Sequence, residues 1–195
     1  YHRFYEFQPD LNIANPEVRE EIKKICSFWL QLGVSGFRMD AVPFIIEQTE
    51  PGNPNSPKDM EFLSELRQHV QWRQGDAVLL AEANVEPDKL KDFFGDGGGT
   101  ANRIHMLFDF MLNSRLMLSL ARGNPEAIID ALRDTPKLPV GGQWATFLRN
   151  HDEIDLGRLP AETPPRLRDL VRRCLERDER PERAVCLLRP LVRPS

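Results

Sequence analysis

Segments with helical spacing of apolar residues alternate with short apolar segments along most of this chain. The first helical segment runs from 16 to 32, because an Asn-Pro pair at 15–16 favours a helix start and Gly33 favours a helix end. A Ser-Pro pair at 56–57 repeats the start signal before a second helical segment. Further helices are predicted over 87–94 and over 111–134, the latter with an interruption at 123–125.

Short segments of strand length separate these helices. The segment 77–81 is apolar throughout, which is typical of a parallel strand covered on both faces. Alternation of helices and strands predicts a parallel sheet with helical crossovers, an α/β fold. Periodicity alone leaves open whether the sheet closes into a barrel or stays open and doubly wound. The predicted strands cover 36–40, 77–81, 104–110 and 144–148, with a helix as the alternative over 104–110.

Composition and charge exclude several classes of protein. Of the 195 residues 41% are hydrophobic, and the formal net charge is −4. No apolar run approaches the roughly 20 residues that span a membrane, and the acidic balance gives no reason to expect nucleic acid or anionic lipid as a partner. The chain starts without Met and without a secretory signal. We therefore expect a piece of a longer protein, in the cytoplasm.

The three cysteines are Cys26, Cys174 and Cys186. Their odd number and their spacing fit no metal site, so we expect free thiols in a reducing compartment. Composition also changes near residue 159, because every basic residue in 160–195 is an arginine and prolines are frequent there. We divide the chain into a body, 1–159, and an Arg/Pro-rich tail of uncertain origin. The tail is interpreted as frame-shifted or read-through sequence, with a faint likeness to the last helix of a protein kinase as the alternative.

Acidic residues follow three of the predicted strands: Asp40, Glu82 and Asp152. In a parallel α/β barrel these strand ends open onto one face, where active sites lie. The alternative is that each acid caps the next helix. Arg38 lies two residues before Asp40, so both side chains face the same side of a strand, and the guanidinium favours an ionised carboxylate. Glu82 ends an apolar strand, where partial burial favours the protonated form of a general acid.

Four segments resemble the α-amylase family of glycoside hydrolases. Residues 36–40 (GFRMD), 80–83 (LAEA) and 147–152 (FLRNHD) resemble its signatures on the fourth, fifth and seventh barrel strands. Residues 8–12 (QPDLN) resemble a loop motif ahead of the fourth strand. The resemblance implies a partial (β/α)8 TIM barrel covering about strands 4 to 7. The family's Asn-His motif at the third strand and an eighth strand are not found in the sequence.

The resemblance also implies roles for individual residues. Asp40 would be the nucleophile that forms a covalent glycosyl intermediate, and Glu82 the acid/base. Asp152 would bind ring hydroxyls, while Arg38 and His151 would position Asp40 and the sugar. A retaining pair of carboxyl groups lies roughly 5–5.5 Å apart.

Residues next to these motifs indicate which subgroup of the family the chain resembles most. Residues 41–44 (AVPF), 82–84 (EAN) and 151–156 (HDEIDL) are most similar to trehalose synthases and related α-glucosidases. The resemblance implies an α-glucoside substrate such as maltose, isomerised to trehalose by intramolecular glucosyl transfer. Residues 106–110 depart from the trehalose synthase pattern, which keeps an α-glucosidase or α-amylase hydrolysing α-1,4-glucosides as the alternative. A catalytically inactive amylase-like protein is the rival from another class, whereas a nucleotide-binding protein would need a Gly-rich loop after a strand.

A structural calcium is also implied by the resemblance, with no organic cofactor. The matching positions are the carbonyls of Phe44 and Ile45 and the carboxylate of Glu47, which are oxygen ligands of the kind calcium prefers. The alternative is that Glu47 is a solvated helix residue. Because a partial barrel exposes strand edges and apolar faces, we expect the isolated chain to be inactive.

Histidine and tryptophan residues outside the motifs receive structural interpretations. We expect His2 and His69 at the surface. His105 is predicted in the core or in a pocket wall. Trp29 and Trp144 are predicted in the core rather than as platforms for sugars.

Overall fold

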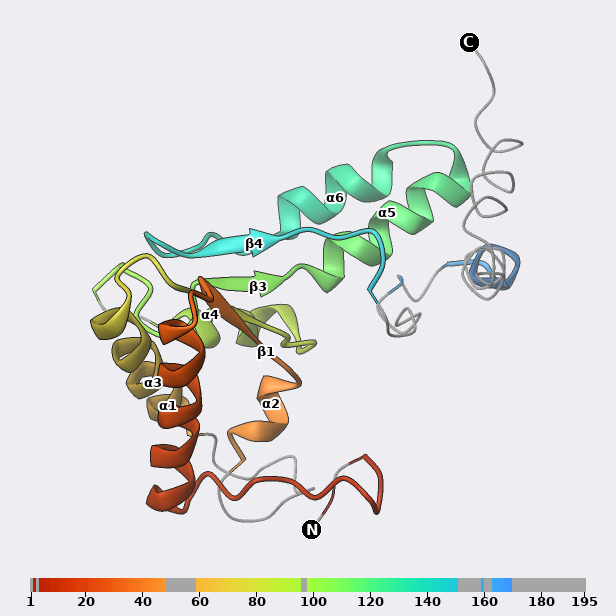
Figure 1. Ribbon diagram of the computed structural model, residues 1–195. Coiled ribbons are helices and arrows are strands. Elements are labelled where there is room, and N and C mark those ends of the chain that lie inside the picture. The colour runs from red at the N-terminus through yellow and green to blue at the C-terminus, as the bar shows by residue number, and fades with distance from the viewer. Residues whose placement is uncertain are drawn as a thin grey trace. The chain divides into compact units, whose positions relative to one another are not determined.

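The computed structural model describes residues 2, 4–47, 59–95, 98–150, 159 and 163–169. Helices and strands alternate along it, as the apolar pattern predicts (Figure 1). No helix in these ranges is long and apolar enough to cross a membrane. In chain order the elements are α1 (Pro16–Gln31), β1 (Gly36–Met39), α2 (Val42–Ile45), α3 (Met60–Arg73), β2 (Val78–Ala81), α4 (Pro87–Phe94), β3 (Met106–Phe108), α5 (Phe110–Arg122), α6 (Glu126–Asp134) and β4 (Gln143–Ala145).

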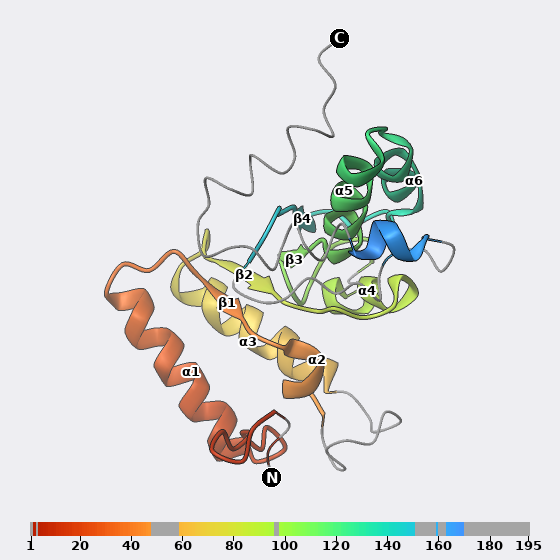
Figure 2. The ribbon, with the colours of Figure 1, turned by 90° about the vertical axis from the view of Figure 1, so that its right-hand side faces the viewer.

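The four strands form one parallel sheet in the order β1-β2-β3-β4. Each strand pairs with the next strand along the chain, with helical segments between them (Figure 2). A doubly wound sheet reverses its strand order at a switch point, whereas a (β/α)8 barrel adds each strand beside the one before it. The observed order is therefore that of a barrel segment, which decides the question that periodicity left open.

Two compact units make up the chain. The first comprises 1–108 and 136–145, with the sheet and α1 to α4; the second comprises 109–135 and 146–195. In the second unit α5 and α6 lie side by side (Figure 1), and Leu118, Ala127 and Leu159 form its buried cluster. The proposed boundary at residue 159 rests on composition and stays a prediction.

Helix starts follow the capping rules, with one correction. The Asn15 side chain accepts the Glu17 N–H at 2.9 Å at the start of α1, as predicted. Helix α3 begins later than the Ser-Pro pair at 56–57 suggested, and that pair lies outside the described residues. Asp59 is its N-cap, since its Oδ1 accepts the Phe62 N–H at 3.0 Å. The carboxylate directly before the apolar stripe of α3 is the stronger start signal.

Polar contacts join α1 to α3, which lie side by side (Figures 1 and 2). Arg19 Nη1 lies 3.0 Å from Glu65 Oε1, and Arg19 also pairs with Asp59. His69 Nε2 lies 3.0 Å from Ser27 Oγ and 2.9 Å from the Lys23 carbonyl oxygen. His69 is thus half-buried between the two helices, with part of its ring at the surface.

The core of the first unit lies between the sheet and the helices. Phe94 is fully buried in it, and the Trp144 ring packs edge-on against Phe94 with centroids 5.4 Å apart. Trp144 is thus partly buried and packs against the core, close to what was predicted. Trp29 is not in the core, because 48% of it is exposed on α1, where it contacts Phe28. Cys26 is a buried free thiol, and burial raises its pKa.

Candidate active site

Strand register brings the candidate catalytic side chains to one face of the sheet. Arg38 on β1 is level with Leu80 on β2, which is level with Met106 on β3. Side chains two residues further along a strand project from the same face. Asp40 and Glu82 each lie two residues beyond Arg38 and Leu80. They therefore lie next to each other at the carboxyl ends of two neighbouring parallel strands.

Backbone hydrogen bonds extend this pairing past the ends of β1 and β2. The Glu82 N–H donates to the Met39 carbonyl at 3.0 Å, and the Glu82 carbonyl accepts the Val42 N–H at 3.0 Å. These two bonds bracket Asp40. Neighbouring strands lie about 4.8 Å apart, so the backbone separation suits the roughly 5–5.5 Å between carboxyl groups of a retaining glycosidase.

One guanidinium contacts both carboxylates. Arg38 Nη1 lies 2.7 Å from Asp40 Oδ1, and Arg38 Nη2 lies 2.5 Å from Glu82 Oε2. The guanidinium carbon lies 5.9 Å from the centroid of the Phe108 ring. The predicted neighbourhood of Arg38 and Asp40 is confirmed, and the structure adds Glu82 as a second partner. Arginine suits this place because its planar group offers several donors in a fixed geometry.

The two carboxyl groups differ in exposure. The Asp40 side chain is 66% exposed and the Glu82 side chain 18% exposed. The partial burial predicted for Glu82 is thus confirmed. Glu82 is thus the more enclosed of the two carboxyl groups, and Asp40 is the more accessible one. The protonation states of the two groups stay predictions.

Ala41 bends the chain directly after Asp40. Its φ of 44° and ψ of 41° make it left-handed, and it is the single non-glycine with positive φ among the described residues. Alanine pays a steric cost of about 1–2 kcal/mol in this conformation. Such strain is concentrated at functional sites. The sequence held no signal for this turn, because alanine has no local preference for the left-handed region.

The capping alternative applies to a fourth strand-end acid, Asp109, which sequence reasoning did not single out. Asp109 is buried at the end of β3, and its Oδ1 accepts the Leu112 N–H at 2.8 Å, so it caps α5. Burial raises the pKa of Asp109, while this hydrogen bond lowers it. By contrast α2 and α4, which follow Asp40 and Glu82, have no side-chain cap. Helix capping therefore does not account for Asp40 and Glu82.

Asp152 and His151 lie outside the described residues, so their predicted roles stay predictions. The strand before them is shorter than the predicted 144–148, because β4 ends at Ala145. The carbonyls of Phe147 and Leu148 accept from Asn113 Nδ2, at 2.8 and 2.9 Å, instead of continuing the strand ladder.

The predicted calcium positions lie at and just after α2. The Phe44 carbonyl accepts the N–H groups of Ile46 and Glu47, the latter at 3.3 Å. With the Ile45 carbonyl and the Glu47 carboxylate it supplies hard oxygen ligands, which fit calcium in kind. Within the described ranges no group of three or more His, Cys, Asp or Glu residues could hold a metal ion. These three positions amount to part of a site, and the calcium stays a prediction.

His105 directly precedes β3, so it lies at the amino ends of the strands, opposite Asp40 and Glu82. Its Nδ1 accepts the Leu79 N–H at 3.1 Å, and its Nε2 lies 3.2 Å from Gln71 Nε2. Burial, with the nearby charge of Arg67, lowers the pKa of His105 to about 4. The His105 ring is half-buried and contacts Leu79 and Gln71.

Comparison with known proteins agrees with this geometry. The chain is 40% identical to a trehalose synthase of Thermus thermophilus over 163 residues, 83% of this chain and 16% of the relative. It is 32% identical to alpha-amylase 3 of Dictyoglomus thermophilum over 79% of this chain and 29% of the relative. The solved alpha-amylase of H. orenii superposes with a TM-score of 0.59 at 25% identity, covering 76% of this chain and 29% of that one.

The chain thus spans less than a third of the length of these relatives. Residues 1–162 match the family described as "Alpha amylase, catalytic domain". That match covers most of the chain, including every segment on which the resemblance rests. The strand order, the paired carboxylates and the match agree: the chain belongs to the α-amylase catalytic-domain family, whose fold is a (β/α)8 barrel.

Proposed function

We propose that this chain supplies the nucleophile, Asp40, and the acid/base, Glu82, of a retaining enzyme that isomerises maltose to trehalose. The observation that carries the proposal is the pair of carboxylates on neighbouring strand ends, joined by Arg38 at 2.7 and 2.5 Å. Trehalose synthases of Thermus thermophilus and Mycolicibacterium smegmatis, each 40% identical to the chain, support the choice of reaction.

The first half of the reaction breaks the glycosidic bond. Asp40 attacks the anomeric carbon of the non-reducing glucose of maltose, while Glu82 donates its proton to the departing oxygen. A covalent glucosyl–Asp40 ester and free glucose result. Arg38 holds the Asp40 carboxylate in position for attack. Its contact with Glu82 keeps the proton donor on the side of the leaving oxygen.

The second half transfers the glucosyl unit. The released glucose turns within the pocket so that its anomeric hydroxyl faces the ester. Glu82, now ionised, takes the proton of this hydroxyl as its oxygen attacks the anomeric carbon, and Asp40 leaves. The product is trehalose, and both carboxyl groups return to their initial protonation states. In this scheme Asp152 and His151 bind the ring hydroxyls of the transferred sugar.

Hydrolysis is the second candidate, in which water replaces the anomeric hydroxyl of glucose. The similarity to alpha-amylase 3 of Dictyoglomus thermophilum, at 32% identity, and to the salivary alpha-glucosidase of Aedes aegypti, at 29%, favours it. The chemistry at Asp40 and Glu82 is the same in both reactions. The enclosure of the acceptor site decides between them, because transfer requires that water be excluded.

The test follows the products formed from maltose by the full encoded protein, with any sequence that flanks this chain. We expect trehalose to accumulate, with glucose as a minor product. Asp40→Asn should reduce the rate by a factor on the order of 10³ or more, because the nucleophile is lost. Asp76→Asn is the matched control, since Asp76 is an exposed aspartate before β2. Glucose as the main product would favour hydrolysis, and full activity of Asp40→Asn would refute both reactions.

A further inference from the structure

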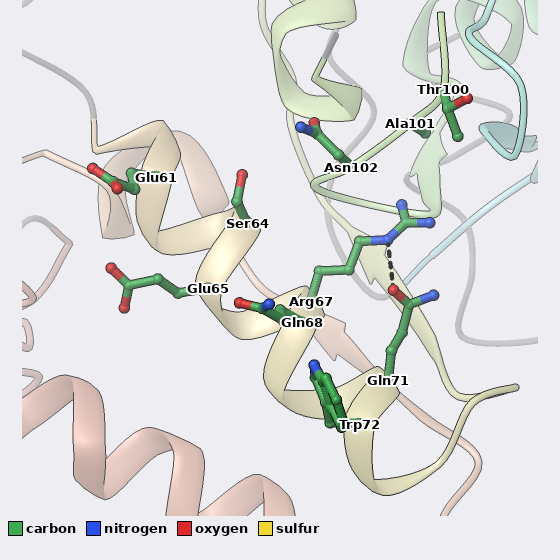
Figure 3. A pocket seen from close by; sticks show the side chains of 10 residues that line it. All are labelled: Glu61, Ser64, Glu65, Arg67, Gln68, Gln71, Trp72, Thr100, Ala101 and Asn102. Carbon is green, nitrogen blue, oxygen red and sulfur yellow. Dashed lines mark hydrogen bonds between the residues drawn. The ribbon is translucent and has the colours of Figure 1, made fainter. Parts of the chain in front are cut away.

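A hollow of about 850 Å³ lies between α3 and the segment 98–102 (Figure 3). Ser64, Gln68 and Trp72 line it from α3, and Asn102 lines it from the other side. Trp72 lies in the last turn of α3, which precedes the amino end of β2. Neither Asp40 nor Glu82 lines the hollow, so it takes no part in the chemistry proposed above.

Trp72 is the apolar feature of this hollow. It is 81% exposed, although a tryptophan side chain gains more than most from burial. A second hollow of about 280 Å³, lined by Lys23 and His69, also includes Trp72. The indole therefore forms a ridge between two depressions, with its ring accessible. Exposed tryptophans of this kind are frequent anchors of binding.

Polar side chains form a row beside the indole. Ser64, Gln68 and Trp72 are spaced four residues apart, so they lie on one stripe of α3 (Figure 3). In the described part of the chain, the side chains of Ser64, Gln68 and Asn102 make no hydrogen bond, and together they offer donors and acceptors. They leave this capacity open to a ligand or to water.

The buried Arg67 and the half-buried Gln71 form the floor of the hollow. Arg67 is 9% exposed, and its Nε donates to Gln71 Oε1 at 3.3 Å (Figure 3). Its Nη1 donates to the Ile104 carbonyl at 3.3 Å. These contacts fix Gln71 and direct the guanidinium away from solvent. A wall that is held in place lowers the ordering cost of binding.

Charge at the rim selects a neutral ligand. Glu61 and Glu65 line the hollow, while Arg67, the one cation among its lining residues, is buried and hydrogen-bonded. A phosphate or a nucleotide would meet the carboxylate of Glu61, whereas Arg19 and Lys23 already pair with the carboxylate of Glu65. A neutral sugar meets none of this repulsion. Its hydroxyls can donate to the carboxylates and can both donate to and accept from the amides.

We propose that this hollow is a second carbohydrate-binding site, which takes a short stretch of neutral α-glucan with one sugar ring stacked on Trp72. A pyranose ring has an apolar face of C–H groups and a rim of hydroxyls, matching the indole and the polar row. The volume lies within the roughly 300–1,000 Å³ of small-molecule sites. The choice of an α-glucan among neutral sugars rests on the proposed function; the stacking on Trp72 does not.

The test is the migration of the full encoded protein in native gels with and without glycogen. We expect glycogen to retard the wild type, and Trp72→Ala to weaken the affinity roughly tenfold or more, as for a tryptophan anchor. Trp29→Ala is the matched control, because Trp29 is a 48% exposed tryptophan on α1, outside the hollow. It should migrate like the wild type. Circular dichroism confirms that both variants are folded.

Several outcomes would overturn the inference. They are wild-type migration unaffected by glycogen, equal losses in Trp72→Ala and Trp29→Ala, or equal retardation by the β-glucan laminarin. A dimer in size-exclusion chromatography that Trp72→Ala dissociates would instead make the hollow an interface between copies.

The proposed reaction and the proposed second site can be tested independently of each other. Asp40→Asn should still bind glycogen at this hollow as the wild type does, because Asp40 is not among the residues that line it. Glycogen retardation without maltose turnover would contradict the proposed reaction alone. Maltose turnover without glycogen retardation would contradict this second site alone.

Discussion

Arg38 is the residue on which the geometry of the candidate site depends. It is 34% exposed, so its ion pairs with Asp40 and Glu82 contribute at most about 1 kcal/mol each to folding. Its value is positional, because a single planar group sets the distance between two carboxylates on different strands. We therefore expect substitutions at Arg38 to change activity more than stability.

Arg38→Lys tests this expectation. A lysine ammonium is a point charge that cannot span two carboxylates in a fixed geometry. We expect turnover of maltose by the full encoded protein to fall by roughly 10- to 100-fold, because displaced catalytic groups react more slowly. The melting temperature should change little. The matched control is Arg122→Lys at the end of α5, and a variant as active as the control would contradict the positional role.

His105 gives a prediction about pH. The pKa of His105 in the folded chain is about 4, below its usual 6.5, because of burial and the charge of Arg67. Between these values the unfolded chain takes up a proton that the folded chain does not, so protonation favours unfolding. The stability contributed by neutral His105 is present above pH 6.5 and is lost as the pH falls towards 4.

Urea unfolding at pH 7 and at pH 5 measures this effect. His105→Asn should lose less stability than the wild type on acidification, because it carries no titrating ring and its amide oxygen can still accept the Leu79 N–H. His2→Asn, at an exposed position, is the control. Equal pH dependence in wild type and His105→Asn would show that other groups account for the acid sensitivity.

At the scale of elements, the close approach of β1 and β2 decides where the catalytic groups meet. A Cβ added to Gly36 would collide with the backbone oxygen of Val78. Glycine therefore permits the register that makes Arg38 level with Leu80. Without that register Asp40 and Glu82 would not lie side by side.

Gly36→Ala should shift or weaken this pairing and lower the free energy of unfolding by about 1–3 kcal/mol, as overpacking does. Gly75→Ala is the matched control, since a Cβ there meets no atom within 4 Å. Chemical denaturation of both variants measures the difference. Equal stability of the two would mean that the strands can part at Gly36 without cost.

At the scale of the whole molecule, one face of α1 is apolar and uncovered by the described residues. It includes Ile25, Phe28, Trp29 and Leu32, which are between 48% and 63% exposed. Exposed apolar patches of this kind are covered by another element or lead to association. The part of each relative that matches this chain makes up less than a third of that relative's length.

We expect residues 1–195 expressed alone to bind the dye ANS, to self-associate and to show no detectable turnover of maltose. Phe28→Gln combined with Leu32→Gln should reduce both dye binding and association, because it removes apolar area from this face. Lys24→Gln is a control on the same helix that leaves the apolar face unchanged. Turnover by the isolated chain that Asp40→Asn abolishes would show that these residues are sufficient for activity.

Local sequence patterns predicted the alternation of helices and strands apart from α2, the limits of α1 and α4, and the position of Arg38 beside Asp40. Each of these depends on residues close in the chain, where periodicity, caps and side-chain direction carry the information. Their places after predicted strands singled out Asp40, Glu82 and Asp152, and the family resemblance assigned their roles.

The remaining features follow from long-range packing. They include the sequential strand order, the reach of Arg38 to Glu82, the left-handed turn at Ala41, and the contacts of His69 between two helices. These features depend on which segments pair and in which register. A local pattern of apolar residues shows which face a residue takes, but not which distant residue lies opposite it, because long-range packing selects that partner.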